Sequence, residues 1–244
     1  MNSDHSTPTL TADQSLEKRK EAVLVDGHVE VLIKSRSRVK AHGEVFTPRH
    51  MVNQMLDVVS PDLESAPGFV DKTFFEPSAG DGNFLTAILN RKLAAITERY
   101  SPAVIPTESL FALASIYGVE LLKDNHNAAQ AAMLGEFVNF HQRNKIPCTP
   151  RTNLFRAAKF LITENIQHGN TLTGRGQDDE ELTFSWWKRR LNVPPTVERE
   201  VFTLNSLREA HRSREPDLFT FNDVPPTYAP CRIDQVFKEV RADD

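Results

Sequence analysis

The sequence predicts an α/β fold: a doubly wound, mostly parallel sheet whose strands are separated by helices. Two observations carry this prediction. Short apolar segments that suit buried strands alternate along the chain with longer amphipathic segments that suit helices. One of these strands also runs directly into a turn that contains Gly80 and Gly82, and a helical pattern opens immediately after it.

Composition is that of an ordinary globular protein, with 39% apolar and 25% charged residues. The 244 residues allow one full domain with short appendages. No apolar run reaches the roughly 18 residues of a membrane span, and the polar N-terminus does not look like a secretory signal. Cys148 and Cys231 are far apart and the histidines lack metal-ligand spacing. We therefore expect a cytoplasmic protein without a disulfide framework, a metal site or a membrane partner.

The chain is expected to fall into four segments. Residues 1–18 are polar and aperiodic, which predicts a disordered tail. Residues 19–40 are expected to form a hairpin and a basic segment, since residues 22–33 alternate around an Asp-Gly pair. Residues 41–190 form the predicted α/β domain. Residues 191–244 are expected to complete or cap its sheet.

The predicted elements follow from periodicity and from the turn residues. Helices are expected at residues 48–59, 83–97, 123–141, 152–162 and 233–240. Strands are expected at residues 73–76, 112–120, 165–168, 182–187 and 201–204, with a loop at residues 100–107. The first helix is expected to place Met51, Met55, Leu56 and Val59 on one face.

Net charge is −4, whereas dedicated DNA-binding domains are usually basic. Two local basic clusters lie at residues 34–40 and 188–190. Each is compatible with a DNA-contacting surface and with an ordinary solvated surface, and charge alone does not decide between them.

The segment from Phe74 to Phe84 is the most informative part of the sequence. Gly80 and Gly82 allow a sharp turn and a close approach of the backbone to a ligand. The carboxyl ends of the strands form the ligand-binding edge of open α/β sheets, so the turn is well placed for a cofactor. Steric freedom alone would also explain two glycines in a tight turn.

The string Phe-Glu-Pro-Ser-Ala-Gly-Asp-Gly-Asn-Phe at residues 75–84 resembles the S-adenosylmethionine (SAM) motif of DNA adenine-N6 methyltransferases. The resemblance implies a Rossmann-like SAM-methyltransferase sheet within residues 41–190 and SAM as the cofactor. It implies that Glu76 lies near the methionine ammonium, where a carboxylate is favourable. The residues implied to bind SAM here are Glu76, Pro77, Ser78, Gly80, Gly82 and Phe84.

Upstream, Gly-Glu-Val-Phe-Thr-Pro at residues 43–48 resembles a second SAM-contacting segment of one class of these enzymes. The resemblance implies that Phe46, Thr47 and Pro48 contact the cofactor, with the last two covering its methionine end. The same residues would also suit a helix start, with Thr47 as N-cap and Pro48 in the first turn.

Two further positions match the ends of predicted strands. Glu120 is placed to accept hydrogen bonds from the ribose hydroxyls, although it lies further along than the usual ~20 residues, because residues 98–110 look inserted. Leu121 is expected to cover the adenine ring. Asn170 stands where the family commonly has an acid that accepts from the adenine amine, and it keeps a carbonyl acceptor. We expect replacement of Glu120 to weaken SAM binding and to spare the fold.

The tetrapeptide [N/D/S]-P-P-[Y/F/W] that grips the flipped adenine in these enzymes is not found. Trp186 and Trp187 end the predicted fourth strand, where the tetrapeptide belongs. In two near matches an extra residue separates the polar position from the prolines. The weak catalytic candidates are Asn192, Pro194, Pro195, Asn222 and Tyr228.

Three interpretations of function remain open. The nominal one is a DNA adenine-N6 methyltransferase that binds DNA weakly alone, with an altered catalytic loop or with DNA recognition supplied by a partner subunit. The second is a catalytically inactive SAM-binding subunit or decoy of a restriction-modification system. The third is a structural relic that binds nothing.

Overall fold

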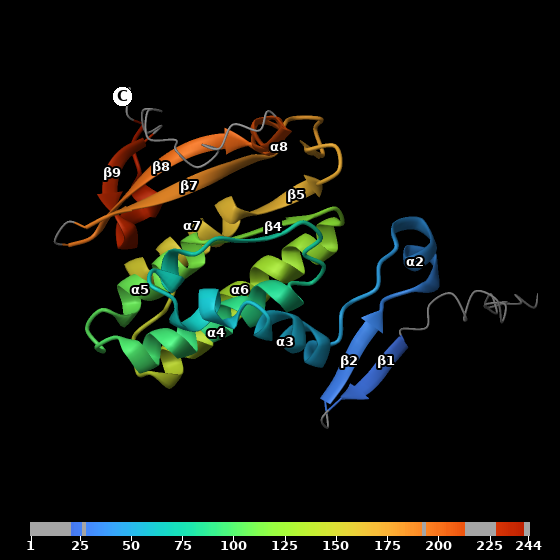
Figure 1. The fold of residues 1–244 in the computed structure, drawn as a ribbon, viewed down its shortest axis with the longest axis horizontal. Helices are drawn as coiled ribbons and strands as arrows, with labels where there is room; N and C mark the ends of the chain where they lie inside the picture. The colour runs from blue at the N-terminus through green and yellow to red at the C-terminus, as the bar shows by residue number, and fades with distance from the viewer. Residues whose placement is uncertain (1–20, 26–27, 192–193, 213–227, 242–244) are drawn as a thin grey trace, which may run out of the picture. The chain divides into compact units, whose positions relative to one another are not determined.

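The computed structural model describes residues 21–25, 28–191, 194–212 and 228–241 (Figure 1). The chain divides into two compact units, Met1–Gln54 and Met55–Asp244. The tail expected at residues 1–18 lies outside the described residues.

The first unit contains the predicted hairpin. Strands β1 (Glu21–Val25) and β2 (His28–Ile33) pair antiparallel, with Val25 opposite His28. Helix α2 (Arg36–His42) follows, and the Ser35 hydroxyl caps it by accepting from the Arg38 amide at 3.2 Å. The helix ends at Gly43 in the left-handed conformation that closes many helices.

Helix α3 (Arg49–Asp57) follows Pro48, as the sequence predicts. Its buried positions are Val52 and Leu56, whereas Met51 and Met55 are about half exposed. The predicted apolar face is therefore wrong for both methionines. Residues four apart lie on one face of a helix. The buried face contains Val52 and Leu56, each one position after an exposed methionine.

The second unit is a mixed α/β structure built on a mostly parallel sheet. Strands β3 (Phe74–Glu76), β4 (Ile116–Glu120) and β5 (Ile166–Asn170) lie side by side and parallel. A short strand, β6 (Arg175–Gly176), pairs antiparallel with β5. This confirms the predicted strands at residues 73–76 and 165–168 to within a few residues.

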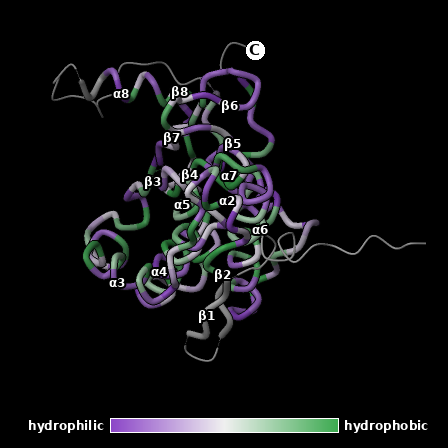
Figure 2. The backbone as a smooth tube through the Cα atoms, turned by 90° about the vertical axis from the view of Figure 1, so that its right-hand side faces the viewer, coloured by the Kyte–Doolittle hydropathy of each residue, from purple (hydrophilic) through white to green (hydrophobic). Residues whose placement is uncertain are grey.

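Four helices connect these strands: α4 (Asn83–Arg99), α5 (Ile105–Ala114), α6 (Lys123–Arg143) and α7 (Asn153–Asn165). They pack against one another as one layer beside the sheet (Figure 1). Hydrophobic and hydrophilic residues alternate along α4, α6 and α7, as Figure 2 shows, because these helices keep one side exposed. Fully buried core residues of this layer include Leu85, Leu89, Leu93, Met133, Phe137 and Leu161.

An antiparallel sheet of β7 (Thr183–Arg190), β8 (Thr196–Thr203) and β9 (Tyr228–Arg232) packs on the other face of β3 and β4. The Phe184 ring meets the rings of Phe75 and Tyr117 edge-on, at centroid distances of 5.9 and 6.1 Å. Neighbouring side chains of a strand point to opposite faces. Accordingly, Phe74 lies against Lys92 of α4. The face that a doubly wound sheet would cover with helices therefore carries strands at β3 and β4.

Two segments differ from the sequence prediction. Helix α5 begins at Ile105 and ends at Ala114, so it occupies the end of the expected loop at 100–107 and the start of the expected strand at 112–120. The reason is that α5 is buried almost throughout and ends in an apolar run at residues 110–114, a pattern that suits a buried strand and a buried helix equally well. The expected fourth strand at residues 182–187 forms, but it pairs with β8 in the antiparallel sheet.

The C-terminal part also contains α8 (Leu204–Arg212), which the sequence did not predict, and a 3-10 helix at Ile233–Lys238, where a helix was expected. Within the residues that the structure describes, no helix is long and apolar enough to cross a membrane.

Candidate functional site

Three predicted residues lie at one edge of the parallel sheet, because β3, β4 and β5 run in the same direction and end side by side. Glu76, Glu120 and Asn170 are the last residues of these strands. We call this edge, with the loops that leave it, the carboxyl edge.

The turn after β3 depends on its two glycines. Gly80 and Gly82 have φ of 57° and 95°, in the left-handed region that side chains other than glycine avoid. A Cβ on Gly82 would lie 2.9 Å from the Ala129 Cα, so this glycine also allows α4 to begin close against α6. The Ala79 amide donates to the Val119 carbonyl at 2.9 Å, which fixes the turn to β4.

Glu120 connects the loops that follow β3 and β4. One carboxylate oxygen accepts from the Gly80 amide at 2.8 Å, and the other accepts from the Leu122 amide at 2.9 Å. The residue is only 5% exposed. A buried backbone donor left without an acceptor costs free energy. Contrary to our expectation from the sequence, this carboxylate therefore also supports the fold.

Glu76 bends back onto its own turn, where its carboxylate accepts from the Ser78 amide at 3.0 Å. Burial raises the pKa of the Glu76 carboxyl, and the Ser78 hydrogen bond opposes that rise. A partly desolvated carboxylate gains more from a nearby cation than an exposed one does. The position would therefore favour an ammonium group.

The loop after β5 is attached to the glycine turn. The Asn170 side-chain carbonyl accepts from the Leu172 amide at 2.9 Å, which closes a local turn. The Thr171 hydroxyl donates to the Pro77 carbonyl at 2.5 Å. Arg208 of α8 donates to the Leu172 carbonyl at 3.1 Å and to the Thr171 carbonyl.

Sequence reasoning did not identify Thr171 or Arg208 as site residues. Thr171 sits beside Asn170, but its contact crosses 94 positions of the chain, and no local pattern signals it. Arg208 lies in a helix that the sequence did not predict.

Leu121, predicted to cover adenine, is 45% exposed beside the carboxyl edge, and its carbonyl accepts a hydrogen bond from His168 at 3.1 Å. Phe84 is half-buried in the first turn of α4.

Phe46, Thr47 and Pro48 belong to the first unit. The Phe46 ring is buried, with the Lys34 ammonium 5.5 Å from its centroid, and its amide donates to the Leu32 carbonyl at 2.9 Å. The Pro48 carbonyl accepts from the Val52 amide at 3.1 Å at the start of α3. The helix-start interpretation of this segment thus has direct support, and its contact with SAM stays a prediction.

The structure does not bring Pro194 and Pro195 together with the glycine turn. Both lie in the loop between β7 and β8, next to the end of β7. Arg189 near that end donates to Glu108 at 2.8 and 2.9 Å and to Asp71 at 3.0 Å. Asp71 and Glu108 precede β3 and β4, so this loop lies towards the amino end of the parallel strands.

Tyr228 also lies towards the amino end of the parallel strands. Its ring is 4.5 Å from the guanidinium of Arg199. Arg199 stands opposite Trp187, whose indole donates to Asn165 at 2.7 Å at the beginning of β5. Asn192 and Asn222 lie outside the described residues.

Arginines of both basic clusters are paired with carboxylates. Arg190 pairs with Glu198 at 2.7 Å, and Arg189 is held by the two carboxylates named above. In the first cluster, Arg38 binds both carboxylate oxygens of Glu44, at 2.5 and 2.7 Å. Carboxylates already neutralise these guanidinium groups, which reduces what they would contribute to binding phosphate.

Among the described residues, no group of three or more His, Cys, Asp or Glu side chains is arranged to hold a metal ion. No protein-family model, curated protein or solved structure matches this chain. The resemblance to adenine-N6 methyltransferases accordingly rests on the sequence motifs alone.

Proposed function

We propose that the chain binds SAM at the carboxyl edge and acts as a SAM-binding component of a DNA-methylation system, without transferring the methyl group by itself. The observation that carries the proposal is the 2.8 Å hydrogen bond from the Gly80 amide to Glu120. It brings together the glycine turn and the strand-end acid, which are the two parts that hold the adenosine moiety in Rossmann-like sheets.

Each part of SAM has a matching group at this edge. The glycine turn allows close backbone approach, and Glu120 offers acceptors to the ribose hydroxyls. Leu121 supplies an exposed apolar surface for the adenine ring. Glu76 offers a carboxylate to the methionine ammonium, and the Asn170 carbonyl offers an acceptor to the adenine amine. In this proposal β3 to β5 correspond to the first half of a SAM-methyltransferase sheet.

The ribose would have to share Glu120 with the backbone, because its carboxylate already accepts from Gly80 and Leu122. A carboxylate has about four lone-pair sites, so ribose hydroxyls would use the remaining sites or replace the Gly80 amide. Gly80 has the backbone freedom that such a shift needs. Replacement of the Gly80 amide would open the turn, whereas use of the remaining sites would leave it closed.

Methyl transfer by this chain alone is the less favoured function. A flipped adenine needs an aromatic ring and amine acceptors close to the cofactor. The described candidates, Pro194, Pro195 and Tyr228, lie towards the opposite end of the parallel strands. This placement favours the inactive SAM-binding subunit over the enzyme.

The test pairs binding with turnover. Calorimetry with SAM and its demethylated product measures binding, and transfer of a radiolabelled methyl group to mixed DNA measures activity, with the pure chain and after adding host extract. The proposal predicts binding, no transfer by the pure chain, and transfer only with an added partner. Methylation by the pure chain would support the enzyme interpretation. Absence of SAM binding would contradict both the enzyme and the inactive SAM-binding subunit.

A further inference from the structure

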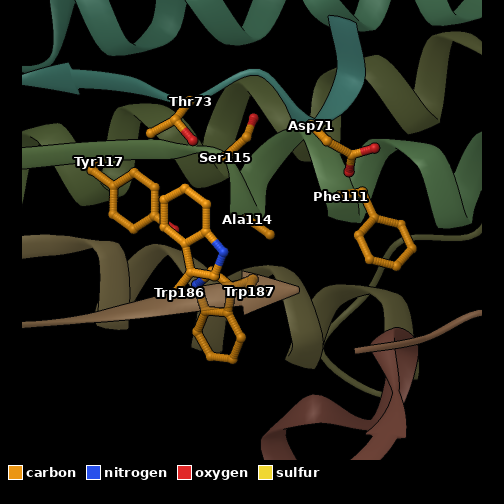
Figure 3. A pocket seen from close by; sticks show the side chains of 8 residues that line it. All are labelled: Asp71, Thr73, Phe111, Ala114, Ser115, Tyr117, Trp186 and Trp187. Atoms are coloured by element: carbon orange, nitrogen blue, oxygen red, sulfur yellow. The ribbon is translucent and has the colours of Figure 1, made fainter. Parts of the chain in front are cut away.

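A second, smaller site lies at the amino end of the parallel strands, away from the carboxyl edge. It is a cavity of about 30 Å³ between the parallel sheet, α5 and β7 (Figure 3). Asp71 and Thr73 reach it just before β3, and Ser115 reaches it just before β4. Neither the SAM motifs nor the catalytic candidates include any of these residues.

Aromatic rings form much of the cavity wall. Phe111, Tyr117, Trp186 and Trp187 all line it. The Tyr117 hydroxyl donates to the Ser185 carbonyl at 2.8 Å, so this residue presents its ring rather than its hydroxyl to the cavity. The faces of such rings attract cations within about 6 Å. Phe111 already holds one cation in this way, since the Arg189 guanidinium lies 3.7 Å from its centroid.

Arg189 alone does not neutralise the two carboxylates beside the cavity, so a second cation would be attracted there. Arg189 is shared by two carboxylates, binding Glu108 through two hydrogen bonds and Asp71 through one. The Asp71 side chain is 46% exposed, and a carboxylate accepts several hydrogen bonds. Burial raises the pKa of the Asp71 carboxyl despite Arg189, so its ionised form would gain from a further positive group.

Lys92 lies beneath this wall and does not fill the cavity. Its ammonium donates to the carbonyls of Val70 and Lys72 at 3.1 and 2.7 Å, and to the Ser115 hydroxyl at 2.7 Å. Its side chain is fully buried, and burial lowers its pKa to about 7. Near neutral pH it therefore contributes less than a full charge to the cluster.

Size restricts the ligand. One water needs about 10–15 Å³ of such volume, so the cavity holds two or three waters and excludes a nucleobase or sugar. A compact cationic head group fits the aromatic wall, the carboxylate and the volume together. We propose that this cavity binds an alkylammonium group, with Asp71 accepting from the ammonium and the ring of Trp186 packing against its carbon chain.

The chain has two tryptophans, and both line the cavity, so their indole N–H signals in NMR spectra report directly on binding. The full chain is titrated with ethylammonium chloride, against sodium chloride at equal ionic strength and against ethanol as a neutral compound of similar size. We expect saturable shifts of the indole signals with ethylammonium alone. Shifts that do not saturate, or that ethanol reproduces, would overturn the proposal.

Two variants locate the binding. Asp71→Asn is expected to weaken ethylammonium binding at least fivefold, and Thr73→Phe, placed at the exposed rim, is expected to block it while leaving the charges intact. Asp57→Asn is the matched control, because Asp57 is also an exposed carboxylate paired with an arginine, 2.8 Å from Arg91. Unchanged binding in a folded Asp71→Asn or Thr73→Phe protein would contradict the assignment.

Two further ligands distinguish the source of the ammonium group. Spermidine represents a free polyamine, and N-acetyl-lysine methylamide represents a lysine side chain of a partner protein. Tighter binding of spermidine than of ethylammonium would indicate a free amine, and tighter binding of the lysine derivative would indicate a partner chain. The titrations contain no SAM, so their outcome is independent of the proposed function.

Discussion

The Gly80 amide donates a 2.8 Å hydrogen bond to the carboxylate of Glu120, 40 residues further along the chain. This bond joins the turn after β3 to the end of β4, and the Leu122 amide anchors the same carboxylate from the other side. Glu120 is therefore a structural residue of the carboxyl edge, whatever ligand binds there.

Replacement of Glu120 by alanine is expected to lower the free energy of unfolding by about 1–3 kcal/mol, because it leaves two backbone donors without their acceptor. Urea denaturation measures this change. Glu98→Ala, at an exposed position of α4, is the control and should change stability by less than about 0.5 kcal/mol. Equal stability of the two variants would show that the carboxylate does not support the turn.

Gly82→Ala is expected to destabilise the second unit by about 1–3 kcal/mol, since the residue has φ of 95° and the new Cβ would lie 2.9 Å from the Ala129 Cα. Gly135→Ala is the matched control, because Gly135 lies inside α6 with open space around its Cβ position. That control should stabilise the protein by about 0.5–1 kcal/mol. Melting temperatures that move in the same direction for both variants would contradict this account of the turn.

Thr171→Val removes the hydroxyl that donates to the Pro77 carbonyl and keeps the size of the side chain. We expect several-fold weaker SAM binding, since the loop after β5 would no longer be held to the glycine turn. Hydrogen exchange should become faster at residues 169–173 and stay unchanged in α6. Thr163→Val, at an exposed helix position, is the control, and equal affinity of the two variants would count against the positioning role.

The buried Lys92 predicts how stability depends on pH. Its pKa is about 7 in the folded chain against an ordinary value of 10.5, so the unfolded chain binds its proton more tightly. Its contribution to stability should therefore be complete above pH 10.5 and be lost as pH falls towards 7. Urea midpoints should rise between pH 7 and 9.5 in the wild type, and they should rise less in Lys92→Met. Parallel curves for the two proteins would show that Lys92 is not responsible.

The sequence predicted those parts of the fold whose signal is local. The glycine turn and the helices at α4 and α6 follow from periodicity and from turn chemistry. Parallel strands then bring Glu76, Glu120 and Asn170 to one edge, which the topology alone implies.

The remaining features depend on contacts between distant segments. Residues 110–114 are apolar throughout, so this end of α5 could not be distinguished from a strand. Strands were predicted at residues 182–187 and 201–204, but their pairing as β7 and β8 was not, because it depends on the register of two antiparallel strands. The Thr171 contact with Pro77 and the Arg208 contacts with the loop after β5 have no local pattern at all.

Calorimetric titration of the full chain with SAM, compared between wild type, Gly80→Val and Gly68→Val, tests whether SAM binds at the carboxyl edge. Gly68 has φ of 73° with open space around its Cβ position, so it controls for backbone strain away from the carboxyl edge. We expect one SAM per chain for wild type and Gly68→Val, and no binding for a folded Gly80→Val. Absence of binding by the wild type at millimolar SAM, or equal binding by all three proteins, would contradict SAM binding at this edge.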